Sequence, residues 1–593
     1  MLRIAKRNLP ILAANMLLAA LLCSLHHWVA MAKNRGDYSP FAVSPAVSSM
    51  TFDETYFYAP IPQRFMSLGQ LPAEVDNYER RNSSAGIAYV PAVILGGMGR
   101  VLGSLERAFI AADLLFPALA FGLLYAASEG VVQSPSFRLL LAWGTLLIPW
   151  APRTFFWFGY DSLLAAPEFA RTPQPEVSFT IALLALLLSA RALMPSAERG
   201  VVIVAGLLGA MVVYSYYFYA IAWGMTLGLL LVLTLFWRNW VVAKRIAIIL
   251  SVMISASLPY ILATARGTAE GGQAYLLARV GTFTHAPSVV PLFCFVLGLL
   301  LVWKVGKRLL GEQEHQIRIE ILILFLLSGL AGLNFQVLSG YDAEHSHFWR
   351  RLILPVAFFL CGCWLLSAAE SQRWHRPRVL KGVALAILIC ILLNAGIRQV
   401  CVGARIAELQ RATRPEIELL KWAQSNLPVG SVIGTVDPDL MLMIPVMGAN
   451  FTYVPPGLRS LTPTDEIIDR YYQLASLLGL SKEEVEAIAT PSSHNSRDSQ
   501  LLWVLRVYVE AVSTPQSNGS GDSQILGMSR YGETRQTFSK GYRQYQGVPV
   551  DRQRRLDYVV SSAGTPIPAG ITQRFFHAHT LYVNQQYQLI ALR

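Results

Sequence analysis

The chain has 593 residues, of which 54% are hydrophobic and only 15% are charged. Since a soluble globular protein is about 25% charged, this composition excludes an ordinary soluble protein. The formal net charge is +12. Basic residues that collect in cytoplasmic loops of a membrane protein account for such an excess, and no basic patch of the kind that binds nucleic acid is visible. We therefore expect a membrane protein that has no nucleic-acid partner.

The first apolar run covers residues 10–31 and follows three basic residues. The run is long for the core of a signal peptide and lacks a small-residue cleavage site, so we interpret it as a retained anchor with a cytoplasmic N-terminus. A polar segment, 32–86, then lies outside. The helix expected at 87–104 contains Arg100 and four glycines, which favours a position at the membrane interface over a span.

Ten further apolar stretches are long enough to cross about 30 Å of hydrocarbon, so the sequence predicts eleven spans. In this arrangement the loops predicted inside carry the basic residues, and the C-terminus lies outside. If residues 87–104 also crossed, every later loop would be inverted. The ten stretches are 107–127, 135–151, 177–195, 200–216, 218–237, 246–264, 287–305, 320–338, 352–369 and 382–400.

From about residue 403 the pattern becomes that of a soluble α/β domain. Helices are expected to open at Arg414, Thr464 and Ser481, the last with a capping box. The expected strands cover 431–435, 556–561 and 580–583, and 513–524 is expected to be a mobile loop. The predicted fold is a polytopic α-helical membrane domain, 1–402, whose first outer loop is 32–106, followed by an extracytoplasmic α/β domain, 403–593.

The first outer loop contains Asp53 and Glu54 in an aromatic, otherwise uncharged segment. Next to a low-dielectric boundary a carboxylate becomes a stronger base. It can then act as a general base or hold a divalent cation. A helix N-cap or a solvated acidic pair explains the same two residues, so both interpretations stay open.

The second outer loop, 152–176, is rich in acids that precede a span. These acids are potential metal ligands or substrate contacts, and a loop that simply stays solvated is the alternative. The charged residues considered are Asp161, Glu168, Arg171 and Glu176.

A third polar segment follows the ninth predicted span. Arg350 and Arg351 lie on the outer side, where the charge rule disfavours them, and a lipid phosphate would compensate their charge. His345 and His347 lack the spacing of a zinc site, and we assign His347 a phosphate-binding or acid role. Anchoring in the headgroup region by arginine and tryptophan is the alternative.

This order of one span, a long outer loop with Asp53-Glu54, an interfacial helix, further spans and an outer domain resembles the GT-C superfamily of membrane glycosyltransferases. That class includes oligosaccharyltransferase catalytic subunits, protein mannosyltransferases and the aminoarabinose transferases that act on lipid A. The resemblance covers the membrane part by architecture. Two features of the class are missing: a clean Asp-x-Asp in the second outer loop, and the Trp-Trp-Asp signature of the oligosaccharyltransferases.

The resemblance implies a hexosyl- or pentosyltransferase that moves a sugar, with inversion, from a polyprenyl-phosphate-linked donor. The acceptor would be a glycolipid, a cell-surface polysaccharide or a protein outside a bacterial inner membrane. Asp53 would be the base, and Glu54 would orient it. The implied cofactor is Mg²⁺ or Mn²⁺, held by Asp53, Asp161 and Glu168. The donor phosphate would be bound by His347, Arg350, Arg351, Arg171, Tyr341 and His345.

Other functions remain open at this point. A polysaccharide polymerase or ligase would use the same lipid-linked donors, although such enzymes place their main outer loop between late spans. A transporter is expected to show internal repeats and broken helices, and no repeat is visible. An assembly protein of cell-envelope glycan is the remaining alternative.

Overall fold

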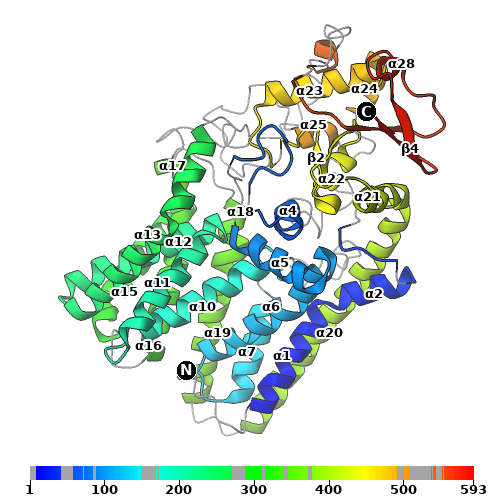
Figure 1. Ribbon diagram of the computed structural model, residues 1–593. Helices are drawn as coiled ribbons and strands as arrows, with labels where there is room; N and C mark the ends of the chain where they lie inside the picture. The colour runs from blue at the N-terminus through cyan, green and yellow to red at the C-terminus, as the bar shows by residue number, and fades with distance from the viewer. Residues whose placement is uncertain are drawn as a thin grey trace. The chain divides into compact units, whose positions relative to one another are not determined.

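The computed structural model is mostly helical, with one small sheet near the C-terminus (Figure 1). It divides into two compact units. The first unit contains Met1–Lys33, Phe109–Ile261 and Gly281–Arg405, and the second contains Asn34–Ala108, Leu262–Val280 and Ile406–Arg593. The structure describes residues 9–35, 37–41, 58–70, 73–83, 89–148, 169, 172–269, 287–309, 314–339, 345–371, 377–457, 459–489, 500–505, 536, 538–542, 551 and 553–592.

Within the described residues, seven helical segments are long and apolar enough to cross a membrane. An eighth is added if α1 (Leu9–Cys23) and α2 (Leu25–Lys33), which meet at an angle of 44°, form one broken span. The chain is therefore a multi-pass membrane protein. The seven are α6 (Leu105–Ala127), α10 (Glu176–Leu193), α12 (Tyr217–Phe236), most of α13 (Trp240–Ala269), α16 (Glu314–Gly332), η2 with α19 (Trp349–Ile353 and Leu354–Ser371), and most of α20 (Pro377–Ala412).

A helix lies at each of the eleven predicted spans, but eleven crossings are not confirmed. Three of these helices are not among the seven: α7 (Pro135–Leu147) and α11 (Arg199–Val213) are short, and α15 (Val289–Leu309) counts as apolar only over Val289–Trp303. Helix α11 ends at Val213 because the chain turns tightly at Tyr214–Tyr216, as three backbone hydrogen bonds show. The expected helix at 87–104 is α5 (Tyr89–Leu102), and its interfacial position stays a prediction.

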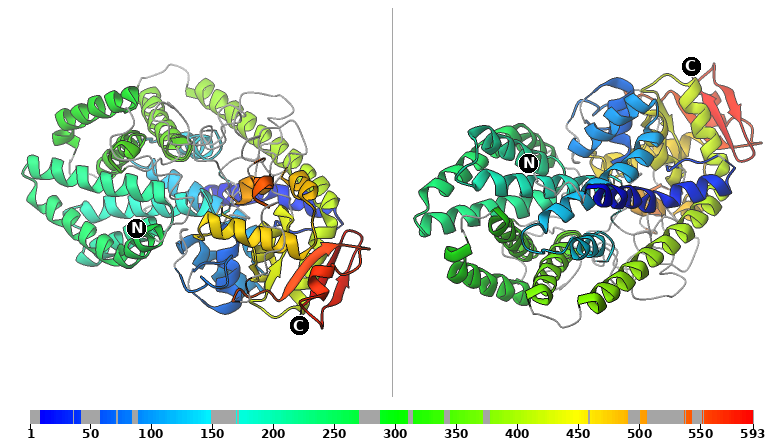
Figure 2. Two further views of the ribbon diagram at one scale, coloured as in Figure 1. Left: turned by 90° about the horizontal axis from the view of Figure 1, so that it is seen from above. Right: turned by 90° about the horizontal axis from the view of Figure 1, so that it is seen from below.

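The helices of the first unit pack closely where small residues face a neighbour. Helix α10 packs against α11 and α16, and α12 packs against the same two helices. These four helices are labelled in Figure 1, and the group of helices to which they belong is seen from above and below in Figure 2. Helix α2 approaches α20 at Gly403, where a Cβ would stand only 2.5 Å from the carbonyl oxygen of His26. Only glycine allows this approach, so Gly403 fixes the distance between α2 and α20.

The second unit contains a five-stranded mixed sheet in the order β2-β1-β3-β5-β4. Strand β1 is parallel to β2 and β3, whereas β5 is antiparallel to β3 and β4. Every residue of β5 is buried, so its side chains do not alternate between apolar and polar, and the sequence did not reveal it. The strands are β1 (Val432–Gly434), β2 (Phe451–Thr452), β3 (Tyr558–Ser562), β4 (His579–Val583) and β5 (Tyr587–Ala591).

The predicted helix starts in this unit are confirmed, including the capping box at Ser481. The predicted loop at 513–524 lies outside the described residues. Among the described residues after Ile406, the helices of the second unit include α21 (Arg414–Asn426), α22 (Pro438–Gly448), α23 (Thr464–Leu477), α24 (Lys482–Ile488), α25 (Gln500–Leu505) and α28 (Ala569–Thr572).

Residues 73–83 of the predicted first outer loop belong to this same second unit. The amide of Thr452 donates to the carbonyl oxygen of Asp76 at 3.0 Å. The Asp76 carboxylate receives two hydrogen bonds from Arg459, at 2.7 and 2.8 Å, and both side chains are fully buried. Helix α4 (Pro60–Leu68) packs against both α5 and α22. The first loop and the C-terminal region therefore form one body.

Candidate active site

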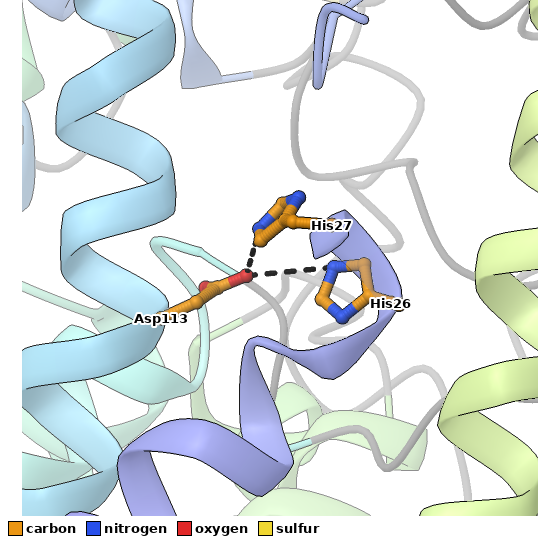
Figure 3. A group of neighbouring side chains, drawn as sticks. All are labelled: His26, His27 and Asp113. Atoms are coloured by element: carbon orange, nitrogen blue, oxygen red, sulfur yellow. Dashed lines mark hydrogen bonds and ion pairs between the residues drawn. The ribbon is translucent and has the colours of Figure 1, made fainter. Parts of the chain in front are cut away.

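Two histidines on α2 and one aspartate on α6 form a buried cluster in the first unit (Figure 3). The Nε2 atom of His27 lies 2.7 Å from Oδ2 of Asp113, and the Nε2 atom of His26 lies 3.6 Å from the same oxygen. Each of the three residues is only 3% exposed. A buried carboxylate is costly unless a partner compensates its charge, and here two imidazoles face it.

A second carboxyl group is connected to this cluster through Thr172. The Thr172 hydroxyl contacts both Oδ1 of Asp113 and Oε2 of Glu176, the latter at 3.0 Å. Because a hydroxyl has one hydrogen to donate, the other contact requires a hydrogen that is carried by one of the two carboxyl groups. The Oε1 atom of Glu176 is buried and has no hydrogen-bond partner among the described residues. Glu176 also lies in the first turn of α10, which favours negative charge.

The segment that carries Thr172 and Glu176 is held against the turn between α11 and α12. The side-chain amide of Gln174 donates to the carbonyl oxygen of Ser215 at 2.6 Å, and Gln174 is fully buried. This hydrogen bond therefore links the segment that carries Thr172 and Glu176 to the tyrosine-rich turn at Tyr214–Tyr216.

On that turn, the hydroxyl of Tyr216 joins two side chains from a later part of the chain. The Nη1 atom of Arg351 donates to it at 2.8 Å, and Nδ1 of His347 lies 2.9 Å from it. The oxygen accepts from arginine and keeps its own hydrogen to donate to Nδ1; in that tautomer the Nε2 atom of neutral His347 is a donor. Arg351 and Tyr216 are each 3% exposed, so this cation lies away from solvent.

Arg351 lies in a five-residue π-helix, η2 (Trp349–Ile353), which follows α18 (His345–Phe348). The hydroxyl of Tyr219 donates to the carbonyl oxygen of Arg351 at 2.7 Å. Short π-helical turns are rare and are often found at functional sites. Here the turn and the two tyrosines position one arginine and one histidine together.

The structure brings some of the site residues predicted from the sequence together, and others lie outside the described residues. His347 and Arg351 share Tyr216, Arg350 is exposed in the same turn, and His345 begins α18. Six predicted site residues lie outside the described residues: Asp53, Glu54, Asp161, Glu168, Arg171 and Tyr341.

Sequence reasoning missed His26, His27, Asp113, Thr172 and Tyr216. A signal for the first three existed, because ionisable groups inside an apolar stretch are costly and mark functional positions. The two histidines occur near the end of the first apolar run, and Asp113 is the only acid in the second predicted span. No comparable signal pointed to Thr172 or Tyr216.

Comparisons with known proteins give a match in structure alone. No protein-family model matches the chain, and no curated protein matches its sequence. Among solved structures, ArnT from Cupriavidus metallidurans bound to undecaprenyl phosphate aligns with a TM-score of 0.44 and 13% identity. That alignment covers 100% of this chain and 99% of ArnT.

Two structures from Archaeoglobus fulgidus are also similar. The oligosaccharyltransferase tethered to an acceptor peptide has a TM-score of 0.42 and 10% identity, over 96% of this chain and 70% of that one. The oligosaccharyltransferase AglB with an inhibitory peptide and a dolichol-phosphate has a TM-score of 0.43 and 11% identity, over 94% and 69%. These proteins belong to the class that the sequence resembles. At TM-scores below 0.5 they do not establish the activity of this chain.

Proposed function

We propose that this chain is an integral membrane glycosyltransferase that moves a sugar from a polyprenyl-phosphate-linked donor to an acceptor outside the cytoplasm. One observation carries the proposal: buried Arg351 and half-buried His347 meet at Tyr216, next to a helix long enough to cross a membrane. A fixed cation at the end of a span suits a phosphate that stays attached to a lipid.

The proposed chemistry is a displacement at the anomeric carbon. The acceptor hydroxyl attacks this carbon, the bond to the phosphate oxygen breaks, and the electron pair stays on the lipid phosphate. The guanidinium of Arg351 stabilises that developing charge, and Nε2–H of His347 donates a hydrogen bond to it. Preorganised donors of this kind stabilise a leaving anion more than water does, because they need no reorganisation.

The proton of the acceptor needs a base. On sequence grounds we keep Asp53 in this role, with Glu54 beside it. The donor phosphate would also meet Arg350, Arg171, Tyr341 and His345. An inverting outcome follows from a single displacement, and the sugar would be a hexose or pentose.

The test is transfer of a labelled sugar from a polyprenyl-phosphate donor by membranes that contain the wild type or Asp53→Asn. The wild type should form product, and the variant should lose about 10²- to 10⁴-fold in rate, as expected for loss of a general base. Full activity of Asp53→Asn would reject the base assignment. If the wild type consumed no donor but carried an unmodified solute across vesicles, a transporter would replace the proposal.

A further inference from the structure

We infer that His26, His27 and Asp113 form a binding site for a divalent transition metal ion, with Zn²⁺ as the fitting chemistry. The three ligand atoms lie within 4.8 Å of one another. This site differs in both residues and ligand type from the Mg²⁺ or Mn²⁺ site expected at Asp53, Asp161 and Glu168. It does not depend on the proposed glycosyl transfer.

The separations fit an ion placed between the side chains. Two ligands about 2.1 Å from a tetrahedral ion lie about 3.4 Å apart. The separations from Asp113 Oδ2 are 2.7 Å to His27 and 3.6 Å to His26. The His26 separation already fits, and a shift of about 0.7 Å at His27 would admit an ion. Figure 3 shows both rings directed at the carboxylate.

The hydrogen bonds around the cluster set the tautomer that a metal requires. The Nδ1 atom of His26 lies 3.1 Å from the carbonyl oxygen of Cys23, to which it can only donate. In the neutral ring the lone pair of Nε2 therefore faces Asp113. Two electron-rich atoms 3.6 Å apart repel each other unless the ring is protonated or a metal ion lies between them, and a histidine whose other nitrogen donates to a carbonyl is the usual metal-binding arrangement.

A second buried carboxyl group, that of Glu176, lies outside the three-residue group and is joined to it through Thr172. Its Oε1 atom is buried without a hydrogen-bond partner among the described residues, and its Oε2 atom is joined to Asp113 through Thr172. Thr172 would orient the ligating carboxylate from behind, as outer-shell groups do. Two imidazoles and carboxylate oxygen favour Zn²⁺ or a similar ion over Mg²⁺, which prefers oxygen alone.

The experiment measures the metal content of the full-length protein in detergent, purified through a tag that holds no histidine. After removal of metal with a chelator and titration with Zn²⁺, the wild type should bind about one equivalent tightly. Asp113→Asn, which keeps the side-chain volume, should weaken binding by more than about 100-fold, since loss of a ligand exceeds the effect of an outer-shell change. The control is the double variant His577→Ala/His579→Ala, because both histidines are exposed. It should bind as the wild type does.

A second measurement avoids any variant that fails to fold. Zinc-edge X-ray absorption of the wild type should show two imidazole ligands and the rest oxygen. The inference is overturned if the wild type binds no Zn²⁺, if the absorption spectrum shows no imidazole, or if Asp113→Asn binds as tightly as the wild type. Loss of binding in the exposed double variant instead of Asp113→Asn would also overturn it.

Discussion

The hydroxyl of Tyr216 interacts with two side chains at once, and this sharing defines the proposed donor-binding part of the site. His347 comes from α18 and Arg351 from η2, whereas Tyr216 lies in the turn before α12. Two residues four apart in one segment can be paired from the sequence. Their partner, more than a hundred residues earlier in the chain, depends on tertiary packing that no local pattern encodes.

Tyr216→Phe should lower sugar transfer about 10-fold or more and raise KM for the donor. The variant keeps the ring but removes a hydrogen bond to a charged group, which is worth about 1.5–3 kcal/mol. Steady-state kinetics with a polyprenyl-phosphate donor would measure this. The matched control is Tyr214→Phe, whose hydroxyl donates to the carbonyl oxygen of Ala256 at 3.0 Å. Equal losses in both variants would contradict a specific role for Tyr216.

Glu74 in the second unit should make stability depend on pH. Burial, with a smaller contribution from the charge of Asp76, raises the pKa of Glu74 from 4.5 to about 7. In that window the folded state binds more protons than the unfolded state, so stability falls as pH rises from about 4.5 to 7 and levels off above it.

Glu74→Gln should flatten this dependence. The thermal unfolding midpoint of the purified protein, measured between pH 5 and 8, would show it. Glu483→Gln is the control, because this side chain is exposed, and its pH dependence should match the wild type. A wild-type midpoint that rises between pH 5 and 7, or an unchanged slope in Glu74→Gln, would contradict the assignment.

At the scale of elements, the apolar runs predicted the helices well. Runs of about 20 apolar residues have few alternatives to a helix in lipid, because every backbone polar group must be satisfied within the segment. Lengths were less predictable. The bend between α1 and α2 and the turn that ends α11 interrupt runs that are continuous in hydropathy. The buried strand β5 lacked the alternation by which β3 and β4 were found.

The contact between α2 and α20 should be sensitive to a single methyl group. Gly403→Ala places a Cβ against the His26 carbonyl and should cost about 1–3 kcal/mol through overpacking. Gly396→Ala lies on the same helix, where the new Cβ would meet Leu22 at an ordinary 3.7 Å. That variant should be neutral or stabilising, because alanine is the better helix former.

Thermal unfolding in detergent would compare these two variants, and Zn²⁺ titration would report on His26. Gly403→Ala should lower the unfolding midpoint and weaken zinc binding. Gly396→Ala should lower neither the midpoint nor the affinity for Zn²⁺. If both variants behaved alike, the close approach at Gly403 would not be what positions α2.

At the scale of the whole molecule, the second unit is built from distant parts of the chain. The buried pair of Asp76 and Arg459 joins residues 73–83 to the C-terminal region. From the sequence we expected the first outer loop to belong with the membrane domain and the soluble domain to begin at 403. A contact between residues nearly 400 positions apart leaves no trace in local composition, so this association came from the structure alone.

Arg459→Ala should destabilise the second unit by about 3–5 kcal/mol, because it leaves the Asp76 carboxylate buried and unpaired. Limited proteolysis of the purified protein would report the loss as faster cleavage within the two segments of this unit that begin at Asn34 and at Ile406. Asp76→Asn added to Arg459→Ala should recover part of the stability by removing the uncompensated charge. If Arg459→Ala were as resistant as the wild type, the pair would not hold the unit together.

In the proposed transfer reaction, the lipid phosphate leaves at Arg351. The most direct measurement is the release of free polyprenyl phosphate from a sugar-linked donor by the purified protein in vesicles, for the wild type, Arg351→Ala and Arg199→Ala. Arg199 is exposed at the start of α11 and serves as the control. We predict release by the wild type and Arg199→Ala, and a loss of about 10²- to 10³-fold in Arg351→Ala, as for removal of one preorganised donor. Equal release by Arg351→Ala, or none by the wild type with any sugar tested, would contradict the account.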